Sequence, residues 1–510
     1  MSPQRSTPRP RGKHLRLAGS ALALSLLVPA VAAVPTGVAR TATAAPGAPP
    51  ATAPPAHFVV LGPTGDGLRL TEDSVRAVGG SVVHSWPQIG VVLATSTDPG
   101  FAAVVRAQPA VDQAGASRNL AEQLPPASPS TRLEVLEGTA APGPATAAAD
   151  REPLEADQWD LPLIGANRAH EISTGSPDVT VGVLDYGIDP EHPDLKPNLD
   201  LSKSVSCARD GIPDTAVEAW APADDTQAHG THVAGTIAAA RNGVGVAGVA
   251  PDTSLASVRV IDDDGFIYPE YAVCGFLWAA EHDIDVTNNS YFVDPWYLWC
   301  ESDPDQRAGA EAVRRAAAYA AGHDVVTVAA AGNSGWDLSQ PIHDTDSPNN
   351  GGPQQDRWAG HDCAALPGEL PGVVAVSSVG SDAVKSYFSN YGLGSVAVTA
   401  PGGDARQIPQ TPSANGRILS SVPGGGWGWM QGTSMASPHA AGVVALLRAT
   451  HPEWSAPQVT GALSGQADAL PCPEGYDPDG DGQPDAVCAG GATGAGFYGA
   501  GLIDALDAVR

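Results

Sequence analysis

The stretch Gly432-Thr-Ser-Met-Ala-Ser-Pro-His-Ala-Ala-Gly442 opens a long run of Ala, Val and Leu, and this run predicts a helix over 434–450. Ser434 would then lie in the first helical turn. Backbone N–H groups there lack partners within the helix and can face an oxyanion beside the serine Oγ. The alternative is a helix-capping serine with no chemical role.

Upstream of this helix, short apolar runs alternate with helical patterns. The apolar runs lie at 179–184, 254–261 and 325–330, and the helical patterns at 229–240, 268–281 and 307–321. Continuous apolar runs are typical of parallel strands buried on both faces. The alternation predicts an α/β fold with a doubly wound, mostly parallel sheet flanked by helices. In such sheets, reactive groups gather at the carboxyl ends of the strands.

Three further polar side chains stand at the ends of predicted elements. Asp185 follows the 179–184 run and precedes a Gly turn, so its carboxylate can orient a base or cap the turn. His229 opens His-Gly-Thr-His-Val-Ala-Gly-Thr, and its neutral imidazole can accept a proton near physiological pH. Asn333 follows the third run in Ala-Ala-Ala-Gly-Asn-Ser-Gly and can donate to an oxyanion, or simply form a turn.

Two neighbouring side chains compete for these roles. His229 and His232 could form half of a metal site, but the usual zinc helix has Glu after the first His and a spacing of four. We therefore expect His232 to be a buried structural residue. Ser437 is a second hydroxyl beside Ser434, and the proline that follows it predicts a role in supporting the turn.

The four candidates occur in the order Asp185, His229, Asn333, Ser434. Together with Asp-x-Gly-Ile-Asp, His-Gly-Thr-His-Val-Ala-Gly-Thr and Gly-Thr-Ser-Met-Ala-Ser-Pro-His, this order resembles the subtilisin-like serine peptidases, or subtilases, over about 159–465.

The resemblance implies a secreted serine endopeptidase that hydrolyses peptide bonds through an acyl-enzyme intermediate. Ser434 would be the nucleophile, His229 the general base and Asp185 the residue that orients the base. Asn333 and the Ser434 amide would hold the oxyanion. No cofactor would be required for this chemistry.

One stretch departs from the family pattern. Asp285-Val-Thr-Asn-Asn-Ser-Tyr-Phe-Val293 stands where the family usually has Ser-Leu-Gly-Gly, so substrate preference does not carry over. The aromatic residues in and after this stretch predict either an aromatic-lined cleft or an insertion packed by its own rings beside Cys300. They are Tyr291, Phe292, Trp296, Tyr297 and Trp299.

The N-terminal part of the chain reads as a precursor. Basic residues within 1–16, the apolar run 17–34 and Ala42-Thr-Ala44 predict a signal peptide over 1–44 and hence an extracellular protein. The alternative is an anchor formed by an uncleaved 17–34 segment.

The remaining boundaries follow from composition. The 45–120 region contains a small α+β unit at 57–118, which resembles the inhibitory propeptide of the family. The 121–156 region is rich in Pro and Ala and predicts an exposed linker. The 157–510 region would be the catalytic domain with an acidic C-terminal loop.

Composition limits the partners. The net charge of −29 argues against nucleic acid, because a phosphate binder needs a basic face. We expect protein or peptide substrates, the propeptide as an intramolecular inhibitor, no stable membrane association and a monomer. The rival classes are a catalytically inactive binding or scaffold protein on the same fold and a membrane-anchored processing peptidase with one dedicated substrate.

Six cysteines in an exported chain predict up to three disulfides, and the sequence alone leaves 15 pairings. Cys472 and Cys488 enclose a short polar loop and form the pair best supported by spacing, with Cys207–Cys274 and Cys300–Cys363 as further candidates. The enclosed loop resembles the start of a calcium loop, although its twelfth position is Cys488 rather than Glu. The candidate Ca²⁺ ligands are Asp477, Asp479, Asp481 and Asp485.

Overall fold

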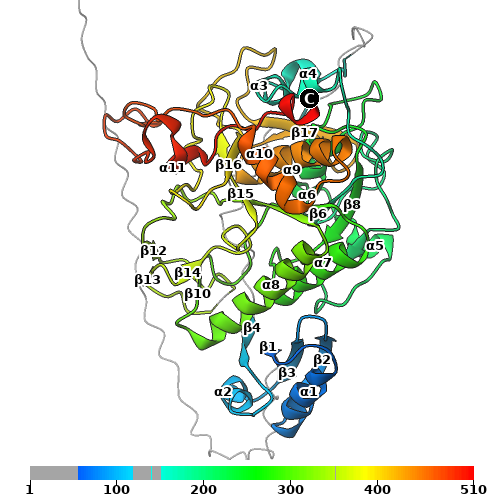
Figure 1. Ribbon diagram of the computed structural model, residues 1–510, viewed down its shortest axis with the longest axis vertical. Coiled ribbons are helices and arrows are strands. Elements are labelled where there is room, and N and C mark those ends of the chain that lie inside the picture. Colours follow the sequence, from blue (N-terminus) through cyan, green and yellow to red (C-terminus); the bar gives the residue numbers. More distant parts are fainter. Residues whose placement is uncertain (1–54, 119–138, 141–150, 351) are drawn as a thin grey trace, which may run out of the picture. The chain divides into compact units, whose positions relative to one another are not determined.

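The computed structural model describes residues 55–118, 139–140 and 151–510 except 351 (Figure 1). Its centre is a seven-stranded sheet in the order β16-β15-β11-β9-β6-β8-β7, and every pairing in it is parallel. The predicted α/β fold is therefore confirmed. The strands are β6 Thr180–Asp185, β7 Val205–Ser206, β8 Ser254–Arg259, β9 Val286–Asn289, β11 Val326–Ala330, β15 Val374–Val379 and β16 Val398–Pro401.

Four long helices cover the sheet: α6 His229–Ala238, α7 Pro269–Glu281, α8 Pro304–Gly322 and α9 Thr433–Thr450 (Figure 1). They belong to two separate cores. The residues of α6 and α9 pack with Val181 and Val183 of β6, whereas those of α7 and α8 pack with Leu184 of the same strand. Successive side chains of a strand point to opposite faces, so the sheet is doubly wound.

All four helices were predicted, and their ends differ by up to three residues. The largest difference is in α8, which starts at Pro304 instead of 307. Asp303 caps this helix by accepting a hydrogen bond from the Asp305 N–H, and proline suits the first helical position because it has no N–H to leave unpaired.

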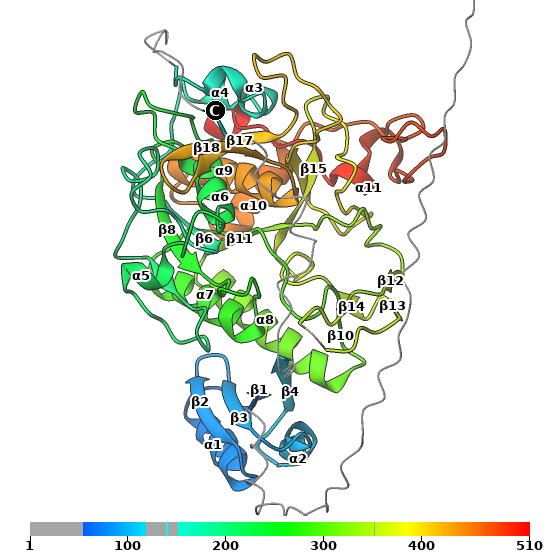
Figure 2. The same cartoon turned by 180° about the vertical axis from the view of Figure 1, so that it is seen from behind.

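Smaller elements surround this centre. A β17–β18 hairpin lies beside α6 and α9, as Figure 2 shows from behind. The elements are α3 Asp160–Leu163, α4 Ala166–Ala169, α5 Val217–Trp220, α10 Ala456–Gly465, α11 Ala495–Tyr498, β5 Thr139–Ala140, β10 Trp299–Cys300, β12 Ile342–Asp344, β13 Arg357–Ala359, β14 Cys363–Ala364, β17 Ile418–Val422 and β18 Gly426–Met430.

Residues 56–118 form an antiparallel sheet in the order β2-β3-β1-β4 with two helices. Side chains such as Phe58, Val75 and Phe101 form a core between the helices and one face of this sheet. The other face places Val59 and Leu93 in the same core as α7 and α8. The elements are β1 Ala56–Leu61, α1 Leu68–Ala77, β2 Ser81–Trp86, β3 Val91–Ser96, α2 Phe101–Arg106 and β4 Gln113–Arg118.

Two residues near the end of the predicted linker, Glu152 and Leu154, are buried. Leu154 is buried against Trp427, and Glu152 accepts hydrogen bonds from the Gly243 and Val244 N–H groups at 2.7 and 3.0 Å. The prediction of an exposed linker is wrong for this end, because one leucine and one carboxylate suffice to anchor it.

The predicted signal segment 1–44 and its anchor alternative lie outside the described residues. Within the ranges that the structure describes, no helix is both long and apolar enough to cross a membrane.

Three disulfides join the six cysteines. The bond Cys472–Cys488 is confirmed, as are the two further candidate pairs, Cys207–Cys274 and Cys300–Cys363. The second of these joins the paired strands β10 and β14, so the aromatic segment before Cys300 is fixed to the body of the protein.

Candidate active site

Asp185 and His229 meet where β6 ends and α6 begins. The His229 Nδ1 lies 2.8 Å from Asp185 Oδ2 and 2.9 Å from Oδ1. The carboxylate is fully buried and also accepts a hydrogen bond of 2.8 Å from the Tyr186 N–H. An ionised carboxylate can only accept, so the imidazole proton is on Nδ1 and the His229 Nε2 is left as a proton acceptor.

Gly230 permits this contact. A Cβ at this position would lie 2.4 Å from the Gly187 carbonyl oxygen and 3.0 Å from Asp185 Oδ1. Any side chain would therefore push the start of α6 away from the end of β6. The glycine after the histidine is thus required by the close approach of helix and strand.

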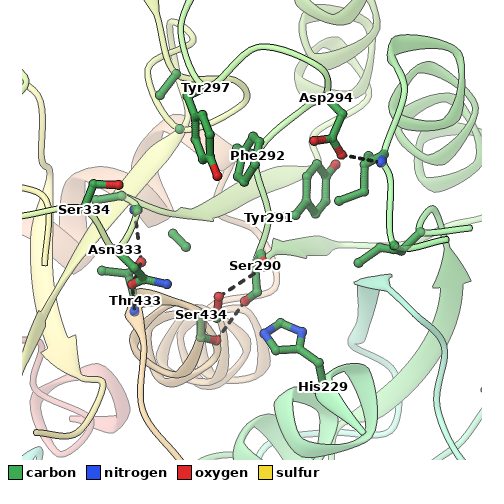
Figure 3. Close-up of a pocket in the computed structure, with 18 of the residues that line it drawn as sticks. His229, Ser290, Tyr291, Phe292, Asp294, Tyr297, Asn333, Ser334, Thr433 and Ser434 are labelled. Carbon is green, nitrogen blue, oxygen red and sulfur yellow. Dashed lines mark hydrogen bonds between the residues drawn. The ribbon is translucent and has the colours of Figure 1, made fainter. Parts of the chain in front are cut away.

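Ser434 lies in the first turn of α9 and is 3% exposed. Its Oγ donates to the Ser290 carbonyl at 3.2 Å, and the Ser290 hydroxyl donates to the Ser434 carbonyl at 2.8 Å. Figure 3 shows the Ser434 side chain and the His229 ring pointing toward each other. The competing hydroxyl of Ser437 is buried and donates to Asn288 Oδ1 at 2.7 Å, which fits the supporting role expected of it.

The orientation of Asn333 is fixed by Thr433. The Asn333 Oδ1 accepts from the Thr433 N–H at 2.8 Å and from its hydroxyl at 2.9 Å. A backbone N–H can only donate, so the atom that it meets is the amide oxygen, and the Nδ2 is on the other side, toward Ser434 (Figure 3). Sequence reasoning missed Thr433, although it stands next to the serine in Gly-Thr-Ser.

Replacing Asn333 by Ala is expected to lower kcat by about 10²–10³ with little change in KM, as loss of one oxyanion donor does in subtilisin. Initial rates on a soluble peptide would measure this. The matched control is Thr433→Val, which removes one of the two hydrogen bonds that hold the Asn333 oxygen and should cost less. Equal rates for wild type and Asn333→Ala would exclude Asn333 from oxyanion binding.

His232 lies one turn further along α6 and is completely buried. Its Nε2 lies 3.1 Å from the Ile418 carbonyl and 3.2 Å from the Gly428 carbonyl, so this nitrogen carries the proton. Burial, assisted by His229, lowers the pKa of His232 to about 3 and keeps it neutral. His232 is therefore a buried structural residue, as expected. Among the described residues, no group of three possible metal ligands contains His229 or His232.

A cavity of about 560 Å³ contains both His229 and Ser434 in its lining. Aromatic side chains form one wall: the Phe292 and Tyr297 rings stack with centroids 4.4 Å apart, and Trp336 meets Tyr297 edge-on at 6.0 Å. The cleft is therefore aromatic-lined, as one interpretation of the sequence held (Figure 3).

Two of the five predicted aromatics support the other interpretation. Trp299 is buried and donates from Nε1 to the Val293 carbonyl at 2.8 Å, while Trp296 lies under the Arg357 guanidinium at 4.7 Å. These two rings pack within the inserted segment before Cys300 instead of forming the aromatic wall of the cavity.

Asp294 is a buried carboxyl group in the same wall. Its Oδ2 accepts from the Ile267 N–H at 2.7 Å and its Oδ1 from the Asn349 side chain at 2.6 Å. Burial outweighs these two hydrogen bonds and raises the pKa of Asp294 to about 7. The carboxyl group therefore holds its proton across the acidic range.

This raised pKa predicts a pH-dependent stability. The unfolded chain releases the Asp294 proton near 3.8, the ordinary value for an aspartate, and the folded chain near 7, so the folded state binds more protons between these values. As the pH rises through this window, the unfolding free energy of the wild type should fall relative to that of Asp294→Asn, by up to about 1.4 kcal/mol per pH unit. Urea unfolding in a Ser434→Ala background would measure it.

The control is Asp66→Asn, which changes an exposed carboxylate. If the stability difference between wild type and Asp294→Asn is the same at pH 4 and at pH 7, the carboxyl group is not protonated in the folded protein.

The candidate calcium ligands are only partly brought together. One carboxylate oxygen from each of Asp477, Asp479 and Asp485 lies within 4.8 Å of the others, while Asp481 is outside this group. Desolvation, followed by the charges of the neighbouring aspartates, raises the pKa of Asp485. Carboxylate oxygens are the ligands that Ca²⁺ prefers, so these three residues fit a calcium ion.

A doubly wound α/β fold with Asp185, His229 and Ser434 at the ends of its elements is the architecture of a serine hydrolase. Comparison with known proteins identifies the family, since residues 176–491 match the family described as the subtilase family. The chain belongs to the subtilase family, and the resemblance of its motifs is confirmed.

Subtilisins are among the relatives. Subtilisin E of Bacillus subtilis (strain 168) is 34% identical over 297 residues, 58% of this chain and 62% of that protein. Subtilisin of Bacillus pumilus has the same identity over 86% of its length. The alignment thus spans less than two thirds of subtilisin E.

A solved structure extends the comparison of the fold. The epidermin leader peptide processing serine protease from Staphylococcus aureus superimposes with a TM-score of 0.66 at 19% identity, covering 89% of this chain and 98% of that one.

Proposed function

We propose that this chain is a secreted serine endopeptidase in which Ser434, His229 and Asp185 act as a catalytic triad. The observation that carries the proposal is the contact of 2.8 Å between His229 Nδ1 and the buried Asp185 carboxylate, with Ser434 facing the same ring across the cavity. This arrangement leaves a neutral imidazole nitrogen beside a hydroxyl, which is what activation of a serine requires.

In the first half of the reaction, Ser434 Oγ attacks the carbonyl carbon of the scissile peptide bond and its proton passes to His229 Nε2. The carbonyl oxygen becomes an oxyanion that accepts from Asn333 Nδ2 and the Ser434 N–H. The buried Asp185 carboxylate stabilises the imidazolium. The C–N bond then breaks, His229 gives the proton to the leaving amine, and an ester to Ser434 remains.

In the second half, His229 takes a proton from a water molecule that attacks the ester carbonyl. The same donors hold the second oxyanion, and collapse returns the proton to Ser434. Apart from the substrate and this water molecule, the groups in this cycle belong to the chain.

The residue 45–120 region is proposed to act as the inhibitory propeptide, with a signal over 1–44, a linker over 121–156 and the catalytic domain over 157–510. The propeptide role is supported by the packing of residues 56–118 against the rest of the protein. A Cβ at Gly115 of β4 would lie 2.2 Å from the Asp305 carbonyl oxygen of α8. Arg106 also forms an ion pair with Asp305 at 2.8 Å. Self-cleavage in the linker would release the enzyme.

The proposal is tested by following the mass of the purified precursor on a gel together with casein digestion, with and without a serine-directed covalent inhibitor. We expect the untreated chain to shorten itself and to digest casein, and the inhibitor to stop the digestion. A folded chain that does neither would favour the inactive scaffold. Self-shortening without casein digestion would favour a processing peptidase with one dedicated substrate.

A structural calcium ion is proposed for the Cys472–Cys488 loop, held by Asp477, Asp479 and Asp485. Calcium in excess should raise the melting temperature of a Ser434→Ala chain relative to chelator, since a ligand at a hundred times its Kd contributes about 2.7 kcal/mol. Asp477→Asn should abolish the shift and Asp481→Asn should largely keep it. An unchanged melting temperature would remove the ion from the account.

A further inference from the structure

The last residue of β4, Arg118, inserts its guanidinium into a pocket of the peptidase body. The Nε lies 3.0 Å from Glu270 Oε1, and the Nη2 donates to Asp210 Oδ1 at 2.5 Å. The Nη1 donates to the Tyr271 hydroxyl at 3.1 Å. The guanidinium carbon also lies 5.1 Å and 5.4 Å from the ring centroids of Tyr268 and Tyr271. We call these four partners of Arg118 the guanidinium pocket.

The ion pair between Arg118 and Glu270 differs from a surface ion pair because the Glu270 carboxylate is buried. The Glu270 side chain is 0% exposed, and within the described part of the chain neither carboxylate oxygen has a hydrogen-bond partner. Arg118 is the cation paired with it. A buried charge without a partner is strongly unfavourable, so the folded body requires a cation at this point.

The chemistry of the pocket fits arginine better than lysine. Two carboxylates and a hydroxyl meet three different nitrogens of one planar group, and two tyrosine rings contact it. A guanidinium spreads its charge over three nitrogens, so it can lie beside several polar groups and against an aromatic ring at once, whereas an ammonium is a compact, strongly hydrated charge.

One short segment of the chain connects the guanidinium pocket with the candidate active site. Glu270 and Tyr271 are at the start of α7, and Gly265 and Ile267, which shortly precede this helix, line the cavity that contains Ser434 and His229. The Ile267 N–H also donates to Asp294 in the aromatic wall. An extended peptide in the cavity could therefore place one side chain in the pocket.

Removal of the 56–118 unit would take Arg118 away and leave Glu270 unpaired. We propose that the guanidinium pocket then binds an arginine side chain of the peptide substrate and so selects substrates with an arginine at one fixed distance from the scissile bond. This inference rests on the proposed peptidase function. Arg118 occupies the pocket in the precursor as a substrate arginine does in the mature enzyme.

The first experiment is independent of catalysis. The full chain carrying Ser434→Ala and Arg118→Ala is heated with N-acetyl-arginine amide or with N-acetyl-citrulline amide, which has the same shape without the charge. Only the arginine compound should raise the melting temperature, and a further Glu270→Gln change should remove the effect. Equal responses to the two compounds, or none to either, would overturn the binding site.

The second experiment uses the self-processed enzyme, so it does not depend on the folding of Arg118→Ala. Peptides with a single arginine or citrulline at successive positions around one scissile bond are compared by kcat/KM. At one position, arginine should be favoured by about tenfold to a hundredfold, the range for a hydrogen-bonded charge. Glu270→Gln should bring this ratio close to one.

The matched control is Asp305→Asn, which breaks the ion pair between Arg106 of the 56–118 unit and Asp305 of the body and should leave the arginine ratio intact. An equal ratio at every position would overturn substrate selection. If no peptide is cleaved at all, the peptidase function itself fails, while the binding experiment still decides whether the guanidinium pocket exists.

Discussion

Ser434→Ala is expected to leave the precursor at full length and to lower kcat by about 10⁶, the loss that follows removal of the nucleophile in subtilisin. The side chain is buried at the start of α9, where its Oγ donates a hydrogen bond of 3.2 Å to the Ser290 carbonyl. The alanine fits the space that the serine leaves, so the fold should persist and the loss should be chemical. Gel mass and peptide turnover measure the two effects.

The matched control for this change is Ser437→Ala. The Ser437 hydroxyl is three residues further along the same helix and donates a hydrogen bond to Asn288 Oδ1. This variant should therefore still shorten itself. Self-cleavage by Ser434→Ala, or its loss in Ser437→Ala alone, would mean that the nucleophile has been assigned to the wrong hydroxyl.

Asp185→Asn is expected to lower kcat by about 10⁴ while leaving the fold intact. An asparagine that turns its NH₂ toward His229 Nδ1 would move the imidazole proton to Nε2. That nitrogen could then no longer accept the Ser434 proton. The amide oxygen could still accept from the Tyr186 N–H, so the melting temperature should change little.

The nearby Asp189 provides a control, since its carboxylate accepts from the Glu191 and Gly424 N–H groups and does not meet His229. Asp189→Asn should retain most of the activity. A similar kcat for both variants would show that the Asp185 charge does not act through the histidine.

The sequence predicted the core of this site because each chemical residue stands at the end of a strongly patterned element. Asp185 ends an apolar strand, and His229 and Ser434 begin helices. The carboxyl ends of parallel strands share one edge of the sheet, so residues 249 positions apart could be expected to meet.

For the aromatic segment, the sequence could not show which side chains line the cavity. Tyr297 lines the cavity and Trp299, two residues later, is buried beneath the insertion. Both are aromatic and both precede the same disulfide. Which ring faces the cavity depends on the packing of the loop against the body, and no local pattern encodes that.

Glu270 could not be identified from sequence for a similar reason. An acidic residue in the first turn of a helix is ordinary, because it interacts favourably with the helix dipole. Its significance depends on complete burial and on an arginine 152 positions earlier in the chain. Leu154 likewise lies in a stretch whose composition predicts disorder, and only its contact with Trp427 shows that this end is packed.

The most direct test of the account is to locate the adduct of a serine-directed phosphonylating reagent by peptide mass mapping. The wild-type chain is first incubated until its mass no longer changes. A single adduct on Ser434 is expected, and none when His229 is replaced by Ala. A folded chain that takes no adduct, or takes it on Ser437, would contradict it.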